Sequence, residues 1–425
     1  EGFGTKGAVS FEPFIAALQP AEGTQGTQLV TPAVVVRDTV VVSSISNKFK
    51  SAHSVNGAIR GLDARTGALK WSWDPLVREA KDGITPTPAD VGGGNTWTPM
   101  SVDNERDLVF VPTASPAPNY WGAHRPGDNK WANSIVALRG STGELVWGFQ
   151  TLHHDIWDRD VGSPPIAVDI QKDGRTIPAL FQLVKTGMLF SFNRETGEPL
   201  FPIEERPVPT DSDIAGEQLS PTQPFPTRPP VLVKNTITPD DAWGFTYFDR
   251  RSCRRQIEAL RHDGVYTPPS LQGTIYMPAF LGGANWGSGA YDPGRQWLYV
   301  NTLNAPGVTR LIPRGANGAQ APKGMTENRE LDLGAGVMFA FFKYTDTGKA
   351  IRACAEGHAG VVAVHEVLTV HQAPDMVISV ISADFEDTIT AQAVEQTVRD
   401  IETAVAGQFP VVTRVYVRPL DRTMV

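Results

Sequence analysis

Apolar positions along this chain fall in short runs, and turns rich in glycine or proline separate the runs. Half-buried strands of about four to eight residues give this pattern, whereas an amphipathic helix needs a longer stretch with a period near about 3.6 residues. The 425 residues include 40 Gly and 34 Pro, which is high for a helical protein. The pattern therefore predicts that most of the chain consists of strands joined by turns.

One hairpin pattern recurs three times: an apolar strand, a Thr-Gly turn, and an aromatic residue four positions after the glycine. A single hairpin of this kind is ordinary, but three copies indicate a repeated unit. A second pattern, in which a charged turn leads into a strand of large apolar residues, occurs twice. The first pattern covers residues 59–71, 135–147 and 189–201, and the second covers 101–113 and 290–302.

These repeats predict four-stranded blades in radial array, as in a β-propeller. In such a fold, we expect the aromatic residue that closes one blade to dock on the next blade. A β-sandwich is the alternative all-β architecture, but it gives no reason for the same turn chemistry to recur. The length of 425 residues also exceeds the usual span of one compact domain, so we expect a large β architecture or two domains.

Residues 150–160, QTLHHDIWDRD, concentrate polar chemistry: two histidines, a tryptophan and three carboxylates lie within eight positions. Lys185 follows at the far end of the next apolar segment. Such a cluster suits a site that orients a flat anionic ligand and holds a carboxylate base beside it. A solvated loop that closes a blade is the alternative interpretation, because loops collect these residue types.

Charge and cysteine content narrow the class of protein. The chain has 38 basic and 46 acidic residues without a clustered basic stripe, so nucleic acid is not an expected partner. Cys253 and Cys354 are far apart in sequence and give no disulfide framework.

The longest run of apolar residues that could be considered as a membrane span, residues 337–342, is too short to cross a bilayer. Because the chain begins at Glu1, any signal or anchor is expected to have been removed or not captured.

Several motifs, in this order and spacing, resemble the membrane-associated quinoprotein glucose dehydrogenases and their quinate dehydrogenase relatives. The resemblance runs from near residue 1 to about Pro313 or a little beyond, and the HHDxWDxD block with its downstream lysine is its most specific part. The motifs are NTWTP around Trp97, APNYWG around Trp121, QTLHHDIWDRD, LVKTG around Lys185, PTQPF at Pro221, TPPSLQGT at Thr267 and LYVNTLNAPG around Asn301.

The resemblance implies an eight-bladed propeller that holds pyrroloquinoline quinone (PQQ) near its axis, with a divalent cation (Ca or Mg) on the quinone carboxylates. It implies oxidation of a sugar or polyol hydroxyl, as in glucose, and transfer of electrons to membrane ubiquinone. It also implies a periplasmic location at the inner membrane. These expectations come from the family and not from composition or spacing.

Individual roles follow from the same resemblance. Asp158 matches the proton-accepting aspartate, Trp97 the tryptophan on which the cofactor stacks, and Lys185 the cation beside the quinone oxygens. Asn301 matches a cofactor-contacting asparagine. Where the family has a metal-associated Asp-Asn pair, the chain reads SISNKFK, so Asn47 or Lys48 falls there depending on register. Taken singly, each residue also has a structural interpretation as packing, turn or cap; taken jointly, their order favours the functional one.

The sequence changes character after about residue 325. Residues 326–346 read as a linker or junction, and residues 347–425 predict one αββαβ unit that resembles the ferredoxin-like C-terminal domain of cation diffusion facilitators. That domain mediates dimerisation in its family, so a homodimer is expected. His365 is interpreted as a surface or interface histidine. The cation diffusion facilitator domain works in the cytoplasm and the quinoprotein family outside it, which points to a gene fusion, a rearranged remnant or a joined fragment.

Two hypotheses follow. In the first, residues 1–325 are an incomplete quinoprotein propeller with the dehydrogenase activity of its family. In the second, the chain is a non-catalytic propeller remnant whose C-terminal module mediates dimerisation. The family's upstream histidine and its last blades find no match here, and Lys48 is a poor neighbour for a divalent cation. We therefore expect the isolated chain to bind PQQ weakly and to show little glucose oxidation.

Overall fold

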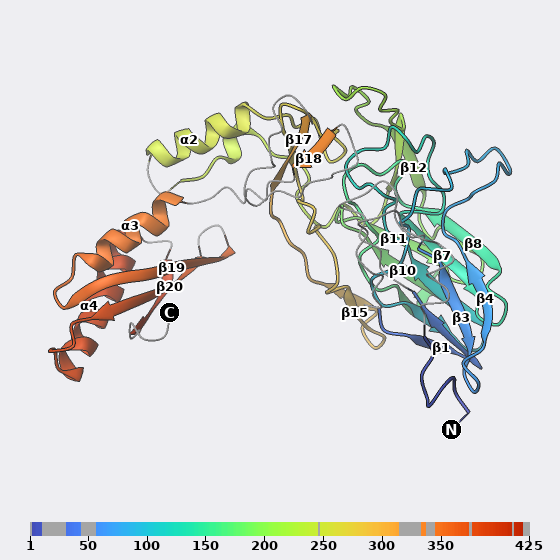
Figure 1. Ribbon diagram of the computed structural model, residues 1–425, viewed down its shortest axis with the longest axis horizontal. Coiled ribbons are helices and arrows are strands. Elements are labelled where there is room, and N and C mark those ends of the chain that lie inside the picture. The colour runs from blue at the N-terminus through green and yellow to red at the C-terminus, as the bar shows by residue number, and fades with distance from the viewer. Residues whose placement is uncertain are drawn as a thin grey trace. The chain divides into compact units, whose positions relative to one another are not determined.

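The structure is a computed structural model that describes residues 2–10, 31–43, 57–244, 247–313, 333–336, 345–373, 376–409 and 412–419. Contacts between its residues divide the chain into two compact units (Figure 1). The first comprises Glu1–Thr238 and Ile257–Phe341, and the second comprises Pro239–Gln256 and Phe342–Val425. The expected domain limits at residues 325 and 346 fall in or beside stretches outside the described residues and stay predictions.

Two four-stranded antiparallel sheets form the N-terminal part of the first unit. In each sheet, consecutive strands pair with their chain neighbours, as expected for a propeller blade. The first sheet contains β1 (Val34–Val36), β2 (Thr39–Val42), β3 (Ile59–Asp63) and β4 (Leu69–Trp73). The second contains β5 (Ser101–Asp103), β6 (Leu108–Pro112), β7 (Ser134–Arg139) and β8 (Leu145–Gln150).

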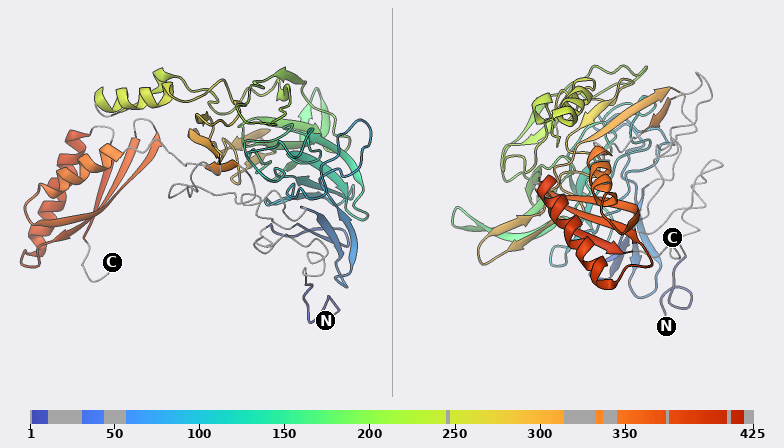
Figure 2. Two further views of the ribbon diagram at one scale, coloured as in Figure 1. Left: turned by 45° about the horizontal axis from the view of Figure 1, so that its top comes forward. Right: turned by 90° about the vertical axis from the view of Figure 1, so that its left-hand side faces the viewer.

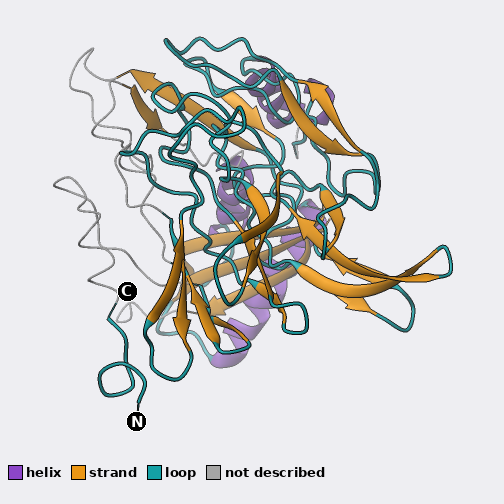
Figure 3. Cartoon of the chain, turned by 90° about the vertical axis from the view of Figure 1, so that its right-hand side faces the viewer, coloured by secondary structure: helices purple, strands orange, loops and turns teal. Residues whose placement is uncertain are grey.

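Smaller sheets complete the first unit, where long loops join the strands (Figure 3). A three-stranded sheet has the order β11 (Leu189–Asn193), β10 (Arg175–Leu183), β9 (Ile166–Lys172). The others are β12 (Ile203–Pro207) with β13 (Thr222–Pro226), β14 (Thr274–Tyr276) with β17 (Gly307–Pro313) and β18 (Leu333–Gly336), and β15 (Gly289–Asp292) with β16 (Trp297–Val300). Among the described strands, these sheets do not complete a closed ring of blades.

The predicted docking of blade-closing aromatics is confirmed at Trp71. This residue lies on β4, and its indole Nε1 donates a hydrogen bond of 2.9 Å to the carbonyl of Gly140, in the β7–β8 turn of the next sheet. A Cβ added to Gly143 would lie 2.6 Å from the Trp71 ring, so the turn glycine lets the indole approach the backbone. Gly143 also has a φ of 73°, in the left-handed region that favours glycine.

The next blade repeats the arrangement one step along the chain. Trp147 on β8 donates through Nε1 to the carbonyl of Arg194, at 3.0 Å, in the turn that follows β11. A Cβ on Gly197, whose φ is 75°, would lie 2.7 Å from the Trp147 ring. The Thr-Gly repeat seen in the sequence is therefore the docking surface for the preceding blade's tryptophan.

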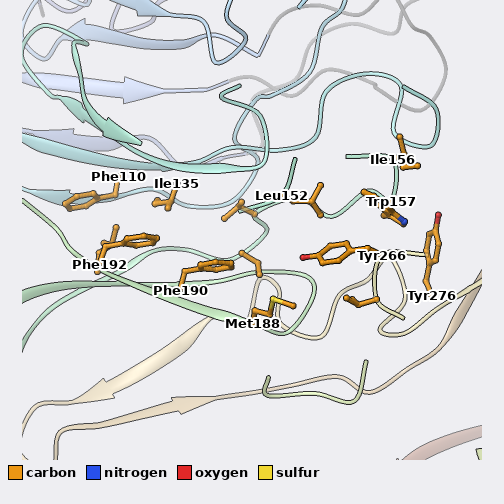
Figure 4. Close-up of a cluster of buried hydrophobic side chains, with 14 of the residues drawn as sticks. Phe110, Ile135, Leu152, Ile156, Trp157, Met188, Phe190, Phe192, Tyr266 and Tyr276 are labelled. Atoms are coloured by element: carbon orange, nitrogen blue, oxygen red, sulfur yellow. The ribbon is translucent and has the colours of Figure 1, made fainter. Parts of the chain in front are cut away.

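Apolar side chains from successive sheets form the principal core of the first unit (Figure 4). Phe190 and Phe192 of β11 stack with their ring planes 3° apart, and both contact Phe149 of β8. At the other end of this core, Trp157 meets Tyr266 edge to face, with ring centroids 5.6 Å apart. Burial of aromatics of this size contributes about 1.5–3 kcal/mol each, so this core holds the site-bearing loops against the strands.

The second unit is built around its own sheet and core. β19 (Val361–Ala373) pairs antiparallel with β20 (Met376–Phe385), and β20 pairs parallel with β21 (Val412–Pro419). Helices α3 (Thr345–Glu356) and α4 (Ala391–Gln408) pack on this sheet (Figure 2). The order αββαβ is the one that the sequence predicted. Ile401 and Val405 of α4 are fully buried, whereas His365 on β19 is exposed.

Two helical segments outside the predicted pattern precede β14. They are the short 3₁₀ helix η1 (Pro239–Asp241) and α2 (Tyr247–Glu258). The segment of α2 carries four arginines and only one buried residue, Ile257, so it lacks the apolar stripe from which a helix is normally predicted. Cys253 of α2 and Cys354 of α3 are both free thiols.

Candidate functional site

The QTLHHDIWDRD segment begins at the end of β8 and forms a buried turn. Trp157 anchors it, because its ring is 1% exposed and its Nε1 donates to the carbonyl of Thr267 at 2.7 Å. His154 and Asp158 both have positive φ angles, 46° and 58°, which reverse the chain direction on either side of the tryptophan. The turn is therefore held by packing in a conformation that costs free energy in isolation.

Asp155 organises this turn through its side chain. One carboxylate oxygen accepts the backbone N–H of Trp157 at 2.8 Å, and the other accepts the N–H of Arg159 at 2.9 Å and the Asn133 amide at 2.8 Å. Short aspartate side chains commonly bridge their own backbone in this way. Asp155 is thus a structural carboxylate, and the remaining two carboxylates of the motif are available for the site.

Lys185 joins those two carboxylates. It lies in the turn between β10 and β11, and its Nζ donates to Asp160 Oδ2 at 3.1 Å, to the Asp158 carbonyl at 2.9 Å and to Asp158 Oδ2 at 3.4 Å. The left-handed backbone at Asp158 directs both carboxylates toward the ammonium. The three side chains are 5% exposed or less, so this is a buried cluster of one cation and two anions.

Burial and charge act in opposite directions on Lys185. Burial lowers the pKa of its ammonium, but the nearby Asp158 and Asp160 carboxylates more than offset this, and the net pKa is raised. Lys185 is therefore a cation at neutral pH. Arg159, between the two aspartates in sequence, is also buried; burial lowers its pKa, and its guanidinium lies 5.5 Å from the centroid of the Tyr276 ring.

The carboxylate oxygens of Asp158 and Asp160 that do not face Lys185 accept hydrogen bonds from uncharged groups. Asn119 Nδ2 donates to Asp158 Oδ1 at 2.5 Å, while the backbone N–H and hydroxyl of Ser115 both donate to Asp160 Oδ1 at 2.6 Å. Sequence reasoning assigned no role to Asp160, Asn119 or Ser115. The WDRD sequence places Asp160 two residues after Asp158, and the APNYWG motif contains Asn119, so both residues could have been singled out from the sequence. Neither motif indicates that Asp160 binds Ser115 and Lys185 or that Asn119 binds Asp158.

The structure places Trp97 next to this cluster. Lys185 Nζ lies 5.5 Å from the centroid of the Trp97 ring, and Trp97 stacks with Trp286 at 5.9 Å. Asn301 is exposed and lies beside Gly287, the residue after Trp286, since a Cβ added to Gly287 would be 2.4 Å from the Asn301 amide. Trp97, Asp158 and Lys185 are thus brought together directly, and Asn301 adjoins them through the Trp286–Gly287 segment.

A second buried pair of polar side chains lies on the other side of the turn. His154 Nε2 is 3.0 Å from Glu217 Oε1, and their side chains are 1% and 2% exposed. Glu217 follows β12 in a loop, and no feature of the sequence pointed to it. Burial raises the pKa of Glu217, but the hydrogen bonds from His154 and from the Gly122 N–H outweigh it, so the net pKa is lowered.

The predicted metal position, Asn47, lies outside the described residues. Within the described residues, no group of three or more His, Cys, Asp or Glu side chains is arranged to hold a metal ion. A search of the helices in the same part of the chain found none that is both long and apolar enough to span a membrane.

Tryptophans dock each four-stranded sheet on the next, as between the blades of a β-propeller, and a buried Lys–Asp–Asp cluster lies beside the half-buried Trp97. A family model described as "PQQ: Glucose/ethanol/alcohol dehydrogenase, beta-propeller domain" matches residues 1–356. The chain belongs to this family of PQQ-dependent dehydrogenase propellers.

The similar proteins are named for different substrates. The chain is 38% identical over 330 residues to quinoprotein glucose dehydrogenase A of Acinetobacter calcoaceticus, covering 76% of this chain and 40% of the relative. It is 36% identical to the glycerol dehydrogenase large subunit of Gluconobacter oxydans, covering 74% and 42%. It is 35% identical to the quinate/shikimate dehydrogenase (quinone) of Acinetobacter baylyi, covering 71% and 37%. The chain thus spans about two fifths of the length of these relatives.

Proposed function

We propose that this chain carries the catalytic part of a PQQ-dependent dehydrogenase that oxidises a sugar or polyol hydroxyl of the glucose type. The observation that supports this most directly is the Lys185 ammonium, buried between Asp158 and Asp160 and 5.5 Å from the Trp97 ring centroid. A flat, multiply charged quinone needs an aromatic surface, a fixed cation and a neighbouring carboxylate base. These are the groups that the cluster combines.

The donor chemistry of the site fits such a cofactor. Trp97 is half-buried and offers an indole for stacking, and Asn301 is exposed beside the glycine after Trp286, which stacks on Trp97. Lys185 has three N–H groups, and all three face oxygens of Asp158 and Asp160. The contact to Asp158 Oδ2, at 3.4 Å, is the longest, so it is the one most readily given to a ligand oxygen.

PQQ supplies the group that accepts hydride from the alcohol carbon, and the chain's own residues handle the proton. The hydrogen bond from Asn119 and the nearby positive charge of Lys185 favour the ionised form of Asp158, the form that accepts a hydroxyl proton. If PQQ were bound here, Lys185 would hold its oxygens and supply a fixed positive charge that stabilises the reduced form. Burial of the cluster strengthens both electrostatic effects relative to water.

The remaining expectations belong to the same proposal. A divalent cation, Ca or Mg, is proposed as a second bound group with Asn47 among its ligands, membrane ubiquinone is proposed as the electron acceptor, and the periplasmic face of the inner membrane is proposed as the location. They rest on the family resemblance. Glucose, glycerol and quinate all occur in the names of the relatives, so the substrate is proposed only as a sugar or polyol.

The test is a chimera in which residues 1–325 replace the matching segment of the Acinetobacter calcoaceticus enzyme. The chimera should reduce an artificial electron acceptor in a PQQ-dependent reaction, and Asp158→Asn should lower kcat by about 10²–10⁴-fold because it removes the base. Asp173→Asn is the matched control, since Asp173 is exposed in the β9–β10 turn and has a similar φ of 52°. Full turnover in Asp158→Asn would refute the assignment.

The isolated 425-residue chain gives a complementary measurement. We expect weak PQQ binding, little glucose oxidation with added calcium or magnesium, and still weaker binding after Lys185→Ala. Lys172→Ala, on β9, is the control that should leave binding unchanged. Strong, PQQ-dependent turnover by the isolated chain would contradict this expectation, whereas equal binding by the Lys185→Ala variant would contradict the proposed role of Lys185.

For the second unit, we propose a ferredoxin-like module of the cation diffusion facilitator type that mediates self-association. The αββαβ order and a core of its own support this, as do the exposed Val362 and Tyr416 on its sheet. Light scattering of the intact chain should then give a dimer, and Tyr416→Glu should shift it toward monomer. If the intact chain is monomeric at high concentration, the proposal fails.

A further inference from the structure

Both ring nitrogens of His154 face acceptors. Nδ1 lies 2.8 Å from the carbonyl oxygen of Gly127, and Nε2 lies 3.0 Å from Glu217 Oε1. A carbonyl oxygen has no proton to donate, so Nδ1 must carry one. Glu217 in turn accepts the backbone N–H of Gly122 at its other oxygen, 2.8 Å away. A Cβ at Gly122 would lie 2.3 Å from His154 Nε2, so this approach requires glycine.

His153 has the same arrangement with different partners. Its Nδ1 lies 3.0 Å from Gln150 Oε1, and its Nε2 lies 3.1 Å from Glu205 Oε1 on β12. The orientation of the Gln150 amide is settled by its nitrogen, which donates to the carbonyls of Asp128 and Ala132 at 2.8 and 3.1 Å. The amide oxygen therefore faces His153 as an acceptor, and Nδ1 must again be the donor.

We infer that His153 and His154 are both imidazolium cations and that, with Glu205 and Glu217, they form a proton-dependent clasp that positions the turn bearing Asp158. Glu205, on β12, binds His153, and Glu217, in the loop that follows β12, binds the adjacent His154. The clasp therefore connects one segment to the HHDxWDRD turn at two points. Gln223 on β13 adds an uncharged contact. Its side-chain oxygen accepts the His153 backbone N–H and its side-chain nitrogen donates to the His153 carbonyl, both at 2.8 Å.

The proton of the buried pair belongs on the histidine. A neutral His154 with a protonated Glu217 would hold the same number of protons, but the Gly122 N–H favours the carboxylate form. The Gly122 N–H, 2.8 Å from Glu217 Oε2, is one of the contacts that lower the Glu217 pKa against the opposing effect of burial. Loss of the second imidazole proton would leave His154 Nε2 facing the Glu217 carboxylate without a hydrogen bond, and this is the change that opens the clasp.

Other charged groups also surround the clasp. Arg125, buried in the 117–128 loop, interacts with both Glu217 and Asp155, and burial lowers its pKa to about 10, so it stays positive through the neutral range. Asp128, in the same loop, has a carboxylate oxygen 3.9 Å from His153 Nδ1 and adds negative charge. The surroundings thus balance two imidazolium cations.

The clasp bears on Asp158 through the 117–128 loop. Gly122 and Gly127 of this loop bind the His154–Glu217 pair, and Asn119 of the same loop donates to Asp158 Oδ1. Opening the clasp releases the loop that holds the carboxylate in place. This consequence for catalysis rests on the proposed role of Asp158, whereas the protonation of the two histidines does not.

The experiment measures protonation and stability on the intact 425-residue chain, without any activity assay. In ¹⁵N-histidine NMR spectra, assigned with single His→Gln variants, both nitrogens of His153 and His154 should be protonated at about neutral pH. In Glu217→Gln, an amide NH₂ can donate to Nε2 while the amide oxygen accepts the Gly122 N–H. A neutral His154 then fits, and one of its nitrogens should appear unprotonated.

Stability against pH gives the second readout. Above histidine's ordinary pKa of about 6.5, the unfolded chain releases protons that the folded clasp retains, so stability should fall as pH rises, by up to about tenfold in the unfolding constant per proton and pH unit. Glu217→Gln should reduce the pH dependence of stability by the contribution of one proton, the one that His154 no longer retains. Glu204→Gln is the matched control, because Glu204 is exposed on β12 and pairs only with Arg206 in the described contacts.

Either readout can overturn the inference. It fails if His154 of the unaltered chain has an unprotonated nitrogen near neutral pH, or if Glu217→Gln keeps the original pH slope. Loss of the clasp signals with normal catalysis in the chimera would leave the proposed function intact. Normal clasp signals with full turnover in Asp158→Asn would instead refute the role of Asp158 and not the clasp.

Discussion

The ammonium of Lys185 lies 3.1 Å from Asp160 Oδ2, and side chains of both residues are about 5% exposed or less. Asp160 accepts two further hydrogen bonds from Ser115, so its charge is compensated from both sides. A buried pair of this kind gives little net stability over an apolar pair, but breaking it leaves charge without compensation in a medium of low polarity. The relationship therefore makes Lys185 structurally important as well as chemically useful.

Lys185→Met should destabilise the first unit by about 3–5 kcal/mol, because Asp158 and Asp160 are then buried together without a cation. Lys172→Met is the comparison: Lys172 donates one hydrogen bond to the Leu200 carbonyl, and its loss should cost at most about 1 kcal/mol. Urea unfolding monitored by tryptophan fluorescence measures both variants. Equal losses would show that the buried cluster is not the source of the effect.

Trp71→Ala should cost about 3–5 kcal/mol, since it empties the contact between the first two blades and removes the hydrogen bond to Gly140. Trp71→Phe keeps most of the packing and should lose about 1 kcal/mol for the missing N–H donor. Trp297→Ala is the control, because Trp297 is 59% exposed and its removal should cost less than about 0.5 kcal/mol. Thermal unfolding of the three variants would contradict the docking role if Trp71→Ala and Trp297→Ala behaved alike.

Gly143→Ala and Gly174→Ala separate backbone strain from close approach. Both glycines have a φ of 73°, so each substitution should cost about 1–2 kcal/mol for the left-handed backbone. A Cβ at Gly174 meets nothing within 4 Å, whereas a Cβ at Gly143 would lie 2.6 Å from the Trp71 ring. Gly143→Ala should therefore be clearly more destabilising in chemical denaturation, and a matching loss in the two variants would argue against a packing requirement.

Asp103→Asn tests an acid-sensitive contact on β5. Burial raises the pKa of Asp103, but Arg194, whose Nε is 2.8 Å away, and Arg106 outweigh it, so the net pKa is lowered. The ionised carboxylate stabilises the folded state above the ordinary aspartate pKa, and this contribution is lost as pH falls through the lowered value. The variant should lose about 1–3 kcal/mol at neutral pH and show a weaker decline in acid.

Asp169→Asn provides the comparison for that measurement. Asp169 binds the same Arg194, at 2.6 Å, but its side chain is 58% exposed and solvent screens the pair. Its substitution should have a much smaller effect on stability between about pH 3 and pH 7. If both variants decline in acid as the unaltered chain does, Asp103 is not a source of the acid sensitivity.

Much of the blade architecture could be predicted from local sequence patterns. The Thr-Gly turn with an aromatic residue four positions later encodes a hairpin and its contact with the preceding blade, because both depend on short-range backbone geometry. For this reason, Trp71 and Trp147 dock as predicted on the turns near Gly143 and Gly197. The motif order likewise pointed to Trp97, Asp158 and Lys185, which the structure brings together.

By itself, then, the sequence determined the repeated hairpins, the family and the motif residues that the structure brings together. Tertiary structure decided which groups meet: Lys185 reaches Asp160 across 25 residues, and His154 meets Glu217 across 63. These pairs join loops whose course depends on how neighbouring sheets pack, and loop residues have no periodic pattern that records a distant partner. The partners of the HHDxWDRD turn therefore follow from packing between segments and not from the motif alone.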